Sequence, residues 1–487
     1  MTINLNGLGI DYGAILPELI VVGTAIVVLF LDLVVPPERR GSLAAVTVVG
    51  LLGALAASLP LWGQNRAAFG DTVVADSLAA FFNVLLIVIS ILTALISPRF
   101  LRALDLDFGE YYILLLGATA GMMLLAAATS LMTIFLGIEL LSICLYVLSG
   151  FARTALRSQE AALKYLLLGG FATGFLLYGM ALIYGATGST TLRGIAAFTV
   201  AGSSLAPGNV LLLVGIALLS VGLAFKVSAA PFHMWTPDVY EGAPTVVTTF
   251  MSVATKAAAF AAIGRIFIGT FPSISSRWYF PLALIAIFSL FIGNLVAITQ
   301  DNIKRMLAYS GIAQAGYILL GVLPGTTQGF TATLFYIAAY AAMNFGAFAV
   351  VTAIGAGGEQ TAELSYWRGL FYRRPFLATV MTIFMLSLAG IPPTVGFFAK
   401  LFVFQALVTA QIWAPLIVAV IMTIVSFYYY LRVIVVMLAQ PDGAVAEKRL
   451  GFSTSTVLGA AAVATIFFGL FPSVVLDWAS HAASLHF

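Results

Sequence analysis

Long apolar runs recur from one end of the sequence to the other, and they restrict the fold more than any other feature. Each run is about twenty residues long, the length that an α-helix needs to cross the hydrocarbon core of a bilayer. Hydrophobic residues make up 62% of the chain and charged residues 8%, whereas a soluble domain carries about 25% charge. The runs are too continuous for the alternating strands of a membrane β-barrel. The sequence therefore predicts an all-α protein embedded in the lipid bilayer.

Windows of about nineteen residues predict fourteen transmembrane helices. The expected spans are 14–35, 42–62, 77–98, 111–128, 130–151, 161–185, 209–230, 244–270, 278–299, 303–323, 329–355, 376–401, 412–438 and 453–477. With this count, fourteen basic residues fall in loops on one side and only Arg66, Arg193 and Arg277 on the other. The positive-inside rule then predicts a multi-pass protein with both termini on the outer side.

Several kinds of site are not expected in this chain. Its basic residues are scattered through short loops, so a nucleic-acid partner is not indicated. The single cysteine, Cys144, cannot form a disulfide framework or hold an iron–sulfur cluster. No stretch resembles the strand–GxGxxG–helix unit of a nucleotide or flavin site. The sequence indicates no metal site and no bound cofactor, so any redox chemistry is expected in partner chains.

Two spans are interrupted by proline beside an intramembrane lysine. In the seventh, Pro231 follows Lys226 by five residues, and in the twelfth, Pro392 and Pro393 precede Lys400. Proline removes a backbone donor and breaks the helix. Such breaks are tolerated at membrane depth only inside protein or beside a water-filled cavity. We therefore expect helices 7 and 12 to be discontinuous.

The breaks occupy comparable places in two blocks of five helices, which predicts an internal repeat. An odd number of helices per block inverts the second block relative to the first, as in many transporters. The expected divisions are three N-terminal helices in 1–110, a first five-helix repeat in 111–275, a second, inverted repeat in 276–440, and a C-terminal helix with its tail in 441–487.

Four ionisable residues lie well inside apolar spans: Glu139, Lys226, Lys256 and Lys400. A charge at the centre of a spanning helix costs roughly 2.5–3.5 kcal/mol, so such residues usually serve ion or proton movement. Glu139 and Lys226 are expected to form a coupled pair, with a purely structural ion pair as the alternative. Lys256 lies about 18 Å along its helix, which is too deep to snorkel easily.

Weaker candidates surround this set. His233 is expected either to relay a proton or to form a hydrogen bond at the helix break. Lys164 and Lys304 lie nearer the inner surface, where a relay role competes with interfacial placement. Arg265 is expected to anchor the outer end of its helix. The buried amides of Asn294, Gln314 and Asn344 either hydrate the interior or bridge helices.

The motifs together resemble the antiporter-like membrane subunits of respiratory complex I. The resemblance covers nearly the whole chain and is carried by FLGIELLSICLYVLSGF, AALKYLLLGG, FKVSAAPFHMWTPDVYEGAPT, DNIKRMLAYSGIAQAGY and LAGIPPTVGFFAKLFVF. The early LPELIVV motif and the lysine at position 400 are most similar to the N-type branch of this family. The resemblance implies a proton path with Glu139 and Lys226 in its first half, Lys256 as the central relay, His233 on the connecting axis and Lys400 on the exit side.

The resemblance also implies partners and a location. It places NADH, FMN, iron–sulfur clusters and quinone in other subunits of the complex, and it predicts contacts with membrane-arm and peripheral-arm subunits in a bacterial inner membrane. The expected activity is proton translocation coupled to electron transfer from NADH to quinone. Two alternatives remain open: the D-type subunit of a multisubunit sodium/proton antiporter, and a membrane scaffold that conducts no ion.

Overall fold

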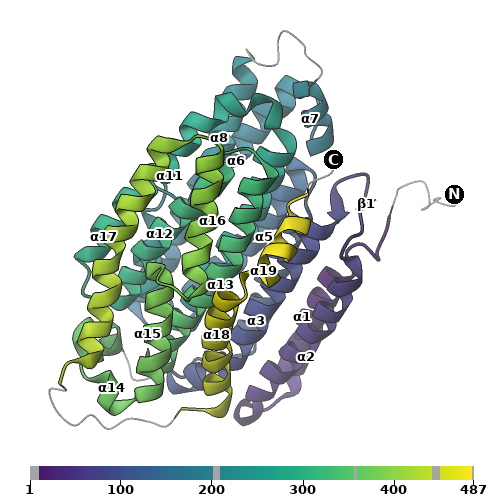
Figure 1. Cartoon of the computed structure of the whole chain (residues 1–487). Helices are drawn as coiled ribbons and strands as arrows, with labels where there is room; N and C mark the ends of the chain where they lie inside the picture. The colour runs from purple at the N-terminus through teal and green to yellow at the C-terminus, as the bar shows by residue number, and fades with distance from the viewer. Residues whose placement is uncertain (1–9, 201–208, 356–358, 441–449, 485–487) are drawn as a thin grey trace.

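The computed structural model describes residues 10–200, 209–355, 359–440 and 450–484, and these form a bundle of long helices (Figure 1). Eleven helices in these ranges are long and apolar enough to cross a membrane, some with a short 3₁₀ or π turn at one end. They are α1 (Leu16–Val34), α2 (Gly41–Ser58), α3 (Ser77–Ala103), α4 (Glu110–Ala127), α5 (Leu131–Ser149), α6 (Leu156–Thr187), α10 (Thr245–Ile263), α11 (Ser275–Ile298), α13 (Thr327–Gly355), α17 (Trp413–Leu438) and α18 (Phe452–Leu470).

Four further helices complete the predicted crossings. Three are shorter and apolar, and the fourth, α12, is longer but more polar because it carries Lys304, Arg305 and Gln314. Their bounds are α8 (Val210–Lys226), α12 (Ile303–Val322), α15 (Pro375–Ala389) and α16 (Val395–Thr409). Since α15 and α16 are the two halves of one crossing, the prediction of about fourteen transmembrane helices is confirmed.

The remaining elements are short, and the hydropathy windows did not resolve them as separate elements. An antiparallel hairpin and four small helices lie at the ends of the bundle or at the breaks: β1 (Arg66–Ala68), β2 (Val73–Ala75), α7 (Leu192–Val200), α9 (Trp235–Gly242), α14 (Leu370–Arg373) and α19 (Pro472–Ala482). Single 3₁₀ turns occupy Pro37–Arg39, Leu59–Leu61, Pro272–Ile274, Glu359–Ala362 and Leu364–Trp367, and a π-helical turn, Gly264–Thr270, extends α10.

Both predicted helix breaks are present. The seventh crossing stops at Lys226, where α8 ends, and the chain becomes helical again only at Trp235. The twelfth stops at Ala389 and resumes at Val395. Gly390 adopts a left-handed conformation with φ of 91°, which ends α15. Each break therefore exposes the last carbonyl groups of a helix inside the bundle.

Paired features relate the two five-helix blocks. Ser130 caps the start of α5 and bridges to Thr191, while Asn302 caps the start of α12 and bridges to Glu363. The sequence distance from Ser130 to Asn302 equals that from Thr191 to Glu363. The bridge at α5 lies near α7, and the bridge at α12 lies near α14, at opposite ends of the bundle (Figure 1). The second block is thus inverted relative to the first.

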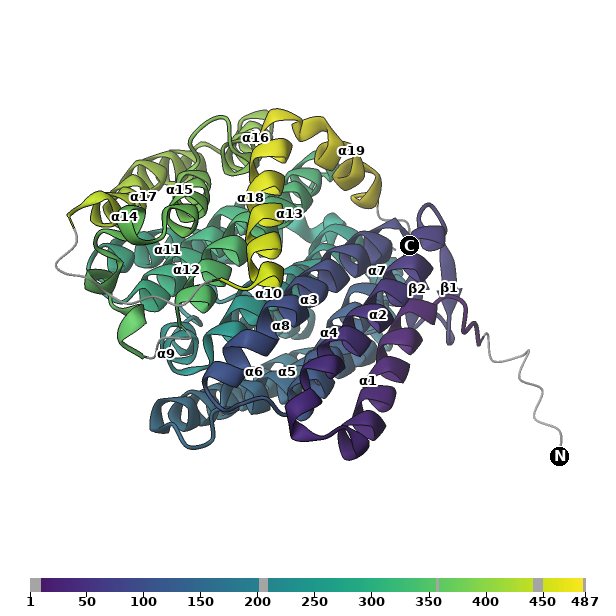
Figure 2. The same cartoon turned by 90° about the horizontal axis from the view of Figure 1, so that it is seen from below.

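Close helix packing repeats with the same spacing. A Cβ added at Gly121 on α4 would meet the backbone nitrogen of Leu141 on α5, and one added at Gly293 on α11 would meet that of Ala313 on α12. Helix α10 lies in the middle of the bundle (Figure 2), and its spanning residues are buried inside the protein. A charged side chain on α10 therefore faces protein and not lipid.

Candidate functional site

The amine of Lys226 lies against α5, the helix that carries Glu139. Lys226 is 4% exposed, and its Nζ donates a hydrogen bond to Ser142 Oγ at 2.6 Å. The same Nζ atom lies 5.9 Å from the ring centroid of Tyr146. Ser142 follows Glu139 by less than one helical turn, and Glu139 accepts a hydrogen bond from Thr173 at 2.8 Å. The structure thus places the Lys226 amine within one turn of Glu139 along α5, while Glu139 itself is half-buried and bonded to α6.

Lys256 is the central buried amine and lies on α10. Its side chain is 1% exposed, and Nζ donates to the carbonyl oxygen of Gly311 on α12 at 2.5 Å. The ring centroid of Tyr340 is 5.5 Å from Nζ, close enough for a cation–π contact. Lys256 therefore links the last helix of the first block to the second block.

Lys400 lies at the second break. Its Nζ donates to the carbonyls of Ala389 at 2.7 Å and Leu388 at 3.2 Å, the last two residues of α15. It is 4% exposed, and the Tyr317 ring centroid lies 4.9 Å from Nζ. The ammonium thus satisfies carbonyls that the break leaves without helical partners.

A hydrogen-bonded cluster connects α12 to the second break, where Lys400 lies. The amide nitrogen of Gln314 donates to Leu388 O at 3.2 Å and to the Tyr430 hydroxyl at 3.0 Å. Its amide oxygen accepts from Tyr336 at 2.5 Å. Tyr430 is in turn 2.6 Å from Ser310, the neighbour of Gly311 in the chain. Buried polar groups therefore extend from the Gly311 carbonyl, which accepts from Lys256, to the Leu388 carbonyl, which accepts from Lys400.

His233 and Lys164 are less deeply buried than the three central lysines. His233 is half-buried in the first break, and its Nδ1 is shielded from solvent. Lys164 is 40% exposed and forms ion pairs with Glu160 and Asp238, both at 2.7 Å. Lys164 is thus far less buried than the three central lysines, and it belongs to a surface charge network.

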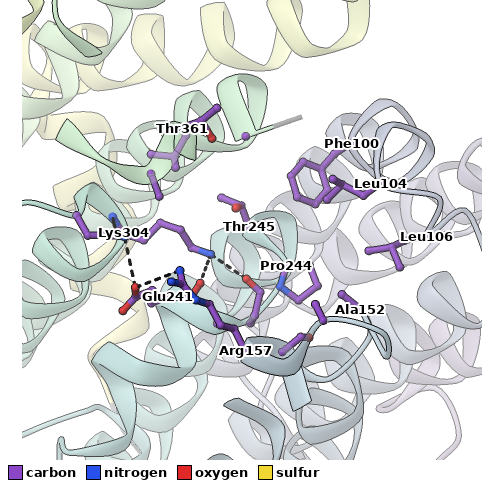
Figure 3. A pocket seen from close by; sticks show the side chains of 18 of the residues that line it. Phe100, Leu104, Leu106, Ala152, Arg157, Glu241, Pro244, Thr245, Lys304 and Thr361 are labelled. Carbon is purple, nitrogen blue, oxygen red and sulfur yellow. Dashed lines mark hydrogen bonds and ion pairs between the residues drawn. The ribbon is translucent and has the colours of Figure 1, made fainter. Parts of the chain in front are cut away.

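Lys304 lines a cavity of about 250 Å³ near the start of α12 (Figure 3). Its Nζ donates to the carbonyls of Glu241 at 2.6 Å and Ala243 at 2.9 Å, at the end of α9. The side chain is nearly buried, with 6% exposed. Lys304 therefore caps α9 from the second block, a contact that its sequence position at the expected membrane interface did not indicate.

Arg305, which the sequence placed at the membrane interface, pairs here with two acidic residues of α9 to which sequence reasoning gave no role. Arg305 forms ion pairs with Asp238 at 2.9 Å and Glu241 at 2.8 Å. Burial opposes ionisation of Asp238, but its hydrogen bonds to Lys164 and Arg305 prevail and lower the pKa of its carboxyl. The acidic spacing of α9, with Asp238 and Glu241 three residues apart, was the available sequence signal, because such residues share one helix face.

Arg265 is more deeply buried than expected for an anchor at the end of a helix. Its guanidinium is 1% exposed and contacts both carboxylate oxygens of Asp76 at 2.8 and 2.9 Å. Its Nε donates to the Ala126 carbonyl at 2.7 Å. Asp76 also caps the start of α3. The ion pair therefore joins α3, α4 and the end of α10.

The chemistry available inside the bundle is that of protonatable amines, hydroxyls and amides. Within the described ranges, no three His, Cys, Asp or Glu side chains form a group that could hold a metal ion. Among the described residues, the hydrogen-bond acceptors of the three buried lysines are neutral oxygens, and Lys226 also lies within one turn of the Glu139 carboxylate along α5. Such an arrangement suits proton transfer between successive sites.

A family model matches most of the bundle. The model described as NADH:quinone oxidoreductase/Mrp antiporter, TM covers residues 128–426. The chain belongs to this family. The resemblance inferred from the motifs is thereby confirmed. A relative from Trichlorobacter lovleyi, named NADH-quinone oxidoreductase subunit N, is 45% identical, with 99% of this chain and 98% of the relative covered. The subunit N of Chloroflexus aggregans is 43% identical, with 96% of each covered.

Solved structures agree with the family assignment. A chain of respiratory complex I from Thermus thermophilus with bound aureothin has a TM-score of 0.79 and 36% identity, covering 95% of this chain and 98% of that one. A chain of the archaeal membrane-bound sulfane sulfur reductase has a TM-score of 0.86 and 26% identity, with 97% of each covered. A chain of the Mrp complex from Dietzia has a TM-score of 0.84 at 23% identity, with 98% and 97% covered, and shows the fold alone.

Proposed function

We propose that this chain is the proton-translocating, N-type membrane-arm subunit of an NADH–quinone oxidoreductase. The observation that carries the proposal is the row of buried lysines Lys226, Lys256 and Lys400 in a chain whose full-length relatives are named subunit N. The likeness to an Mrp chain reaches 23% identity, against 36% for the complex I chain. An antiporter subunit is therefore the weaker reading, and a scaffold would not need buried amines in both blocks.

The proposed path runs laterally through the bundle. Glu139 and Lys226 control the first step, with His233 at the first break as a connecting relay. Lys256 receives the proton at the centre, and Lys400 releases it at the second break. Lys164 and Lys304 are secondary members at the end of the bundle where α9 lies. The acceptors of the three central lysines support this order, because the polar cluster around Gln314 lies between Gly311 and Lys400.

The redox chemistry belongs to partners in this proposal. NADH, FMN, iron–sulfur clusters and quinone bind to other subunits, and this chain contacts further membrane-arm and peripheral-arm subunits. The complex lies in a bacterial inner membrane, with both termini of this chain on the outer side. The paired caps and glycines support a division at 1–110, 111–275, 276–440 and 441–487.

The test uses the purified native complex in liposomes. We expect it to oxidise NADH, reduce quinone and pump protons, and we expect Lys226→Ala and Glu139→Ala to lower pumping while the complex still assembles. The surface variant Arg66→Gln, whose exposed pair with Asp11 lies at the β1–β2 hairpin, is the control. Wild-type proton-to-electron ratios in both the Lys226 and the Glu139 variant would refute the proposed path. A complex that does not oxidise NADH would refute the assignment.

A further inference from the structure

The acceptor of the central lysine is a glycine. Lys256 is hydrogen-bonded to one oxygen in the described part of the chain, the carbonyl of Gly311 at 2.5 Å. Both residues are buried. The backbone of α12 therefore supplies the group that stabilises the ammonium of a lysine on α10.

The missing side chain of Gly311 leaves the space that the ammonium occupies. A Cβ added there would lie 2.8 Å from Lys256 Nζ and 3.0 Å from the hydroxyl of Tyr340. Both distances are shorter than ordinary van der Waals contacts. The Tyr340 hydroxyl is buried and has no hydrogen-bond partner among the described residues. Any larger residue at position 311 must therefore displace the amine or the tyrosine.

The internal repeat gives this position a counterpart. Glu139 and Gly311 have the same separation as the paired caps, Ser130 and Asn302, and the paired glycines on α4 and α11. The first block thus has a carboxylate at this place on α5. The second block has at this place on α12 a glycine, Gly311, which offers only its backbone carbonyl. The lysine that this carbonyl binds, Lys256, comes from the first block.

We propose that Gly311 is a positioning residue for Lys256. Its carbonyl accepts a hydrogen bond from the ammonium, and its lack of a side chain leaves the space that the ammonium occupies. The two functions together fix the central amine at the junction between the two blocks. The proposal rests on the proposed function of Lys256 as a relay and adds the residue that determines where the relay is held.

The test compares Gly311→Ala with Gly311→Ser in the full complex. Alanine should displace the ammonium and lower NADH-driven pumping per assembled complex by on the order of tenfold, since small misplacements of a reacting group are expensive. Serine adds the same Cβ with a hydroxyl that can accept from the amine, as Ser142 does from Lys226. Serine should therefore retain more pumping than alanine, although it is larger. Equal losses, or the reverse order, would show that position 311 acts through helix packing and not through the place of the ammonium, and would overturn the proposal.

Gly170→Ala on α6 is the matched control, because a Cβ added there meets no atom within 4 Å. It should pump as the wild type does, and an equal loss in this control would overturn the proposal. If Lys256→Met pumps normally, Lys256 is not a relay and the proposed path is wrong. If Lys256→Met loses pumping while Gly311→Ala does not, the relay stands and the role of Gly311 is wrong.

A double variant decides the outcome if Gly311→Ala fails to assemble. Methionine is shorter than lysine, so Lys256→Met combined with Gly311→Ala should relieve the clash. Assembly of the double variant, with pumping equal to that of Lys256→Met alone, would support the proposal. Failure of the double variant to assemble, or a further loss of pumping in it, would show that Gly311 acts through packing and overturn the proposal.

Discussion

The ammonium of Lys400 is held by the end of a broken helix, and this contact separates a relay from a packing residue. A relay needs a protonatable group near the carbonyls of Leu388 and Ala389, not specifically an amine. A protonated glutamic acid can also donate to a carbonyl. Lys400→Glu should therefore retain more pumping per NADH than Lys400→Met, measured at equal amounts of assembled complex. Equal or better pumping by the methionine variant would remove Lys400 from the path.

Gln314 offers a second test at the residue scale, with Asn294 as its control. Each is a buried amide hydrogen-bonded to a tyrosine hydroxyl, Tyr430 and Tyr429 respectively. Only Gln314 also shares the Leu388 carbonyl with Lys400. Replacement by methionine should cost about 1–3 kcal/mol of stability in either case. Pumping should fall only in Gln314→Met, and a parallel loss in Asn294→Met would mean that both amides serve packing alone.

At the scale of helices, local patterns predicted the crossings and both breaks because length, hydropathy and proline act within one segment. The same windows missed α9 and the β1–β2 hairpin, since eight residues or a three-residue strand leave no signal in a nineteen-residue average. Contacts between residues far apart in the sequence were harder to predict than the helices themselves. The burial of Arg265 depends on Asp76, which lies 189 residues away in the chain. The acceptors of Lys226, Lys256 and Lys400 likewise depend on how helices pack, which no single segment records.

The Arg265–Asp76 pair should stabilise the junction of α3, α4 and α10. Removing one partner of a buried pair leaves an uncompensated charge and typically costs about 3–5 kcal/mol. Arg265→Met should therefore lower the unfolding temperature of the detergent-solubilised protein clearly. Arg66→Met breaks an exposed pair with Asp11 and should cost about 0–1 kcal/mol. Equal shifts in the two variants would show that Arg265 does not hold these helices together.

Across the whole molecule, the buried amines extend from the first block into the second, while no described cluster of side chains could hold a metal. In the proposed function these amines move protons, and electron transfer in partner subunits supplies the driving force. Purified alone and placed in liposomes, it should not pump protons when NADH and quinone are added, whereas the complete complex should. Proton uptake or release is followed with a pH-sensitive dye. NADH-driven pumping by the single chain would show that the energy source lies within this bundle.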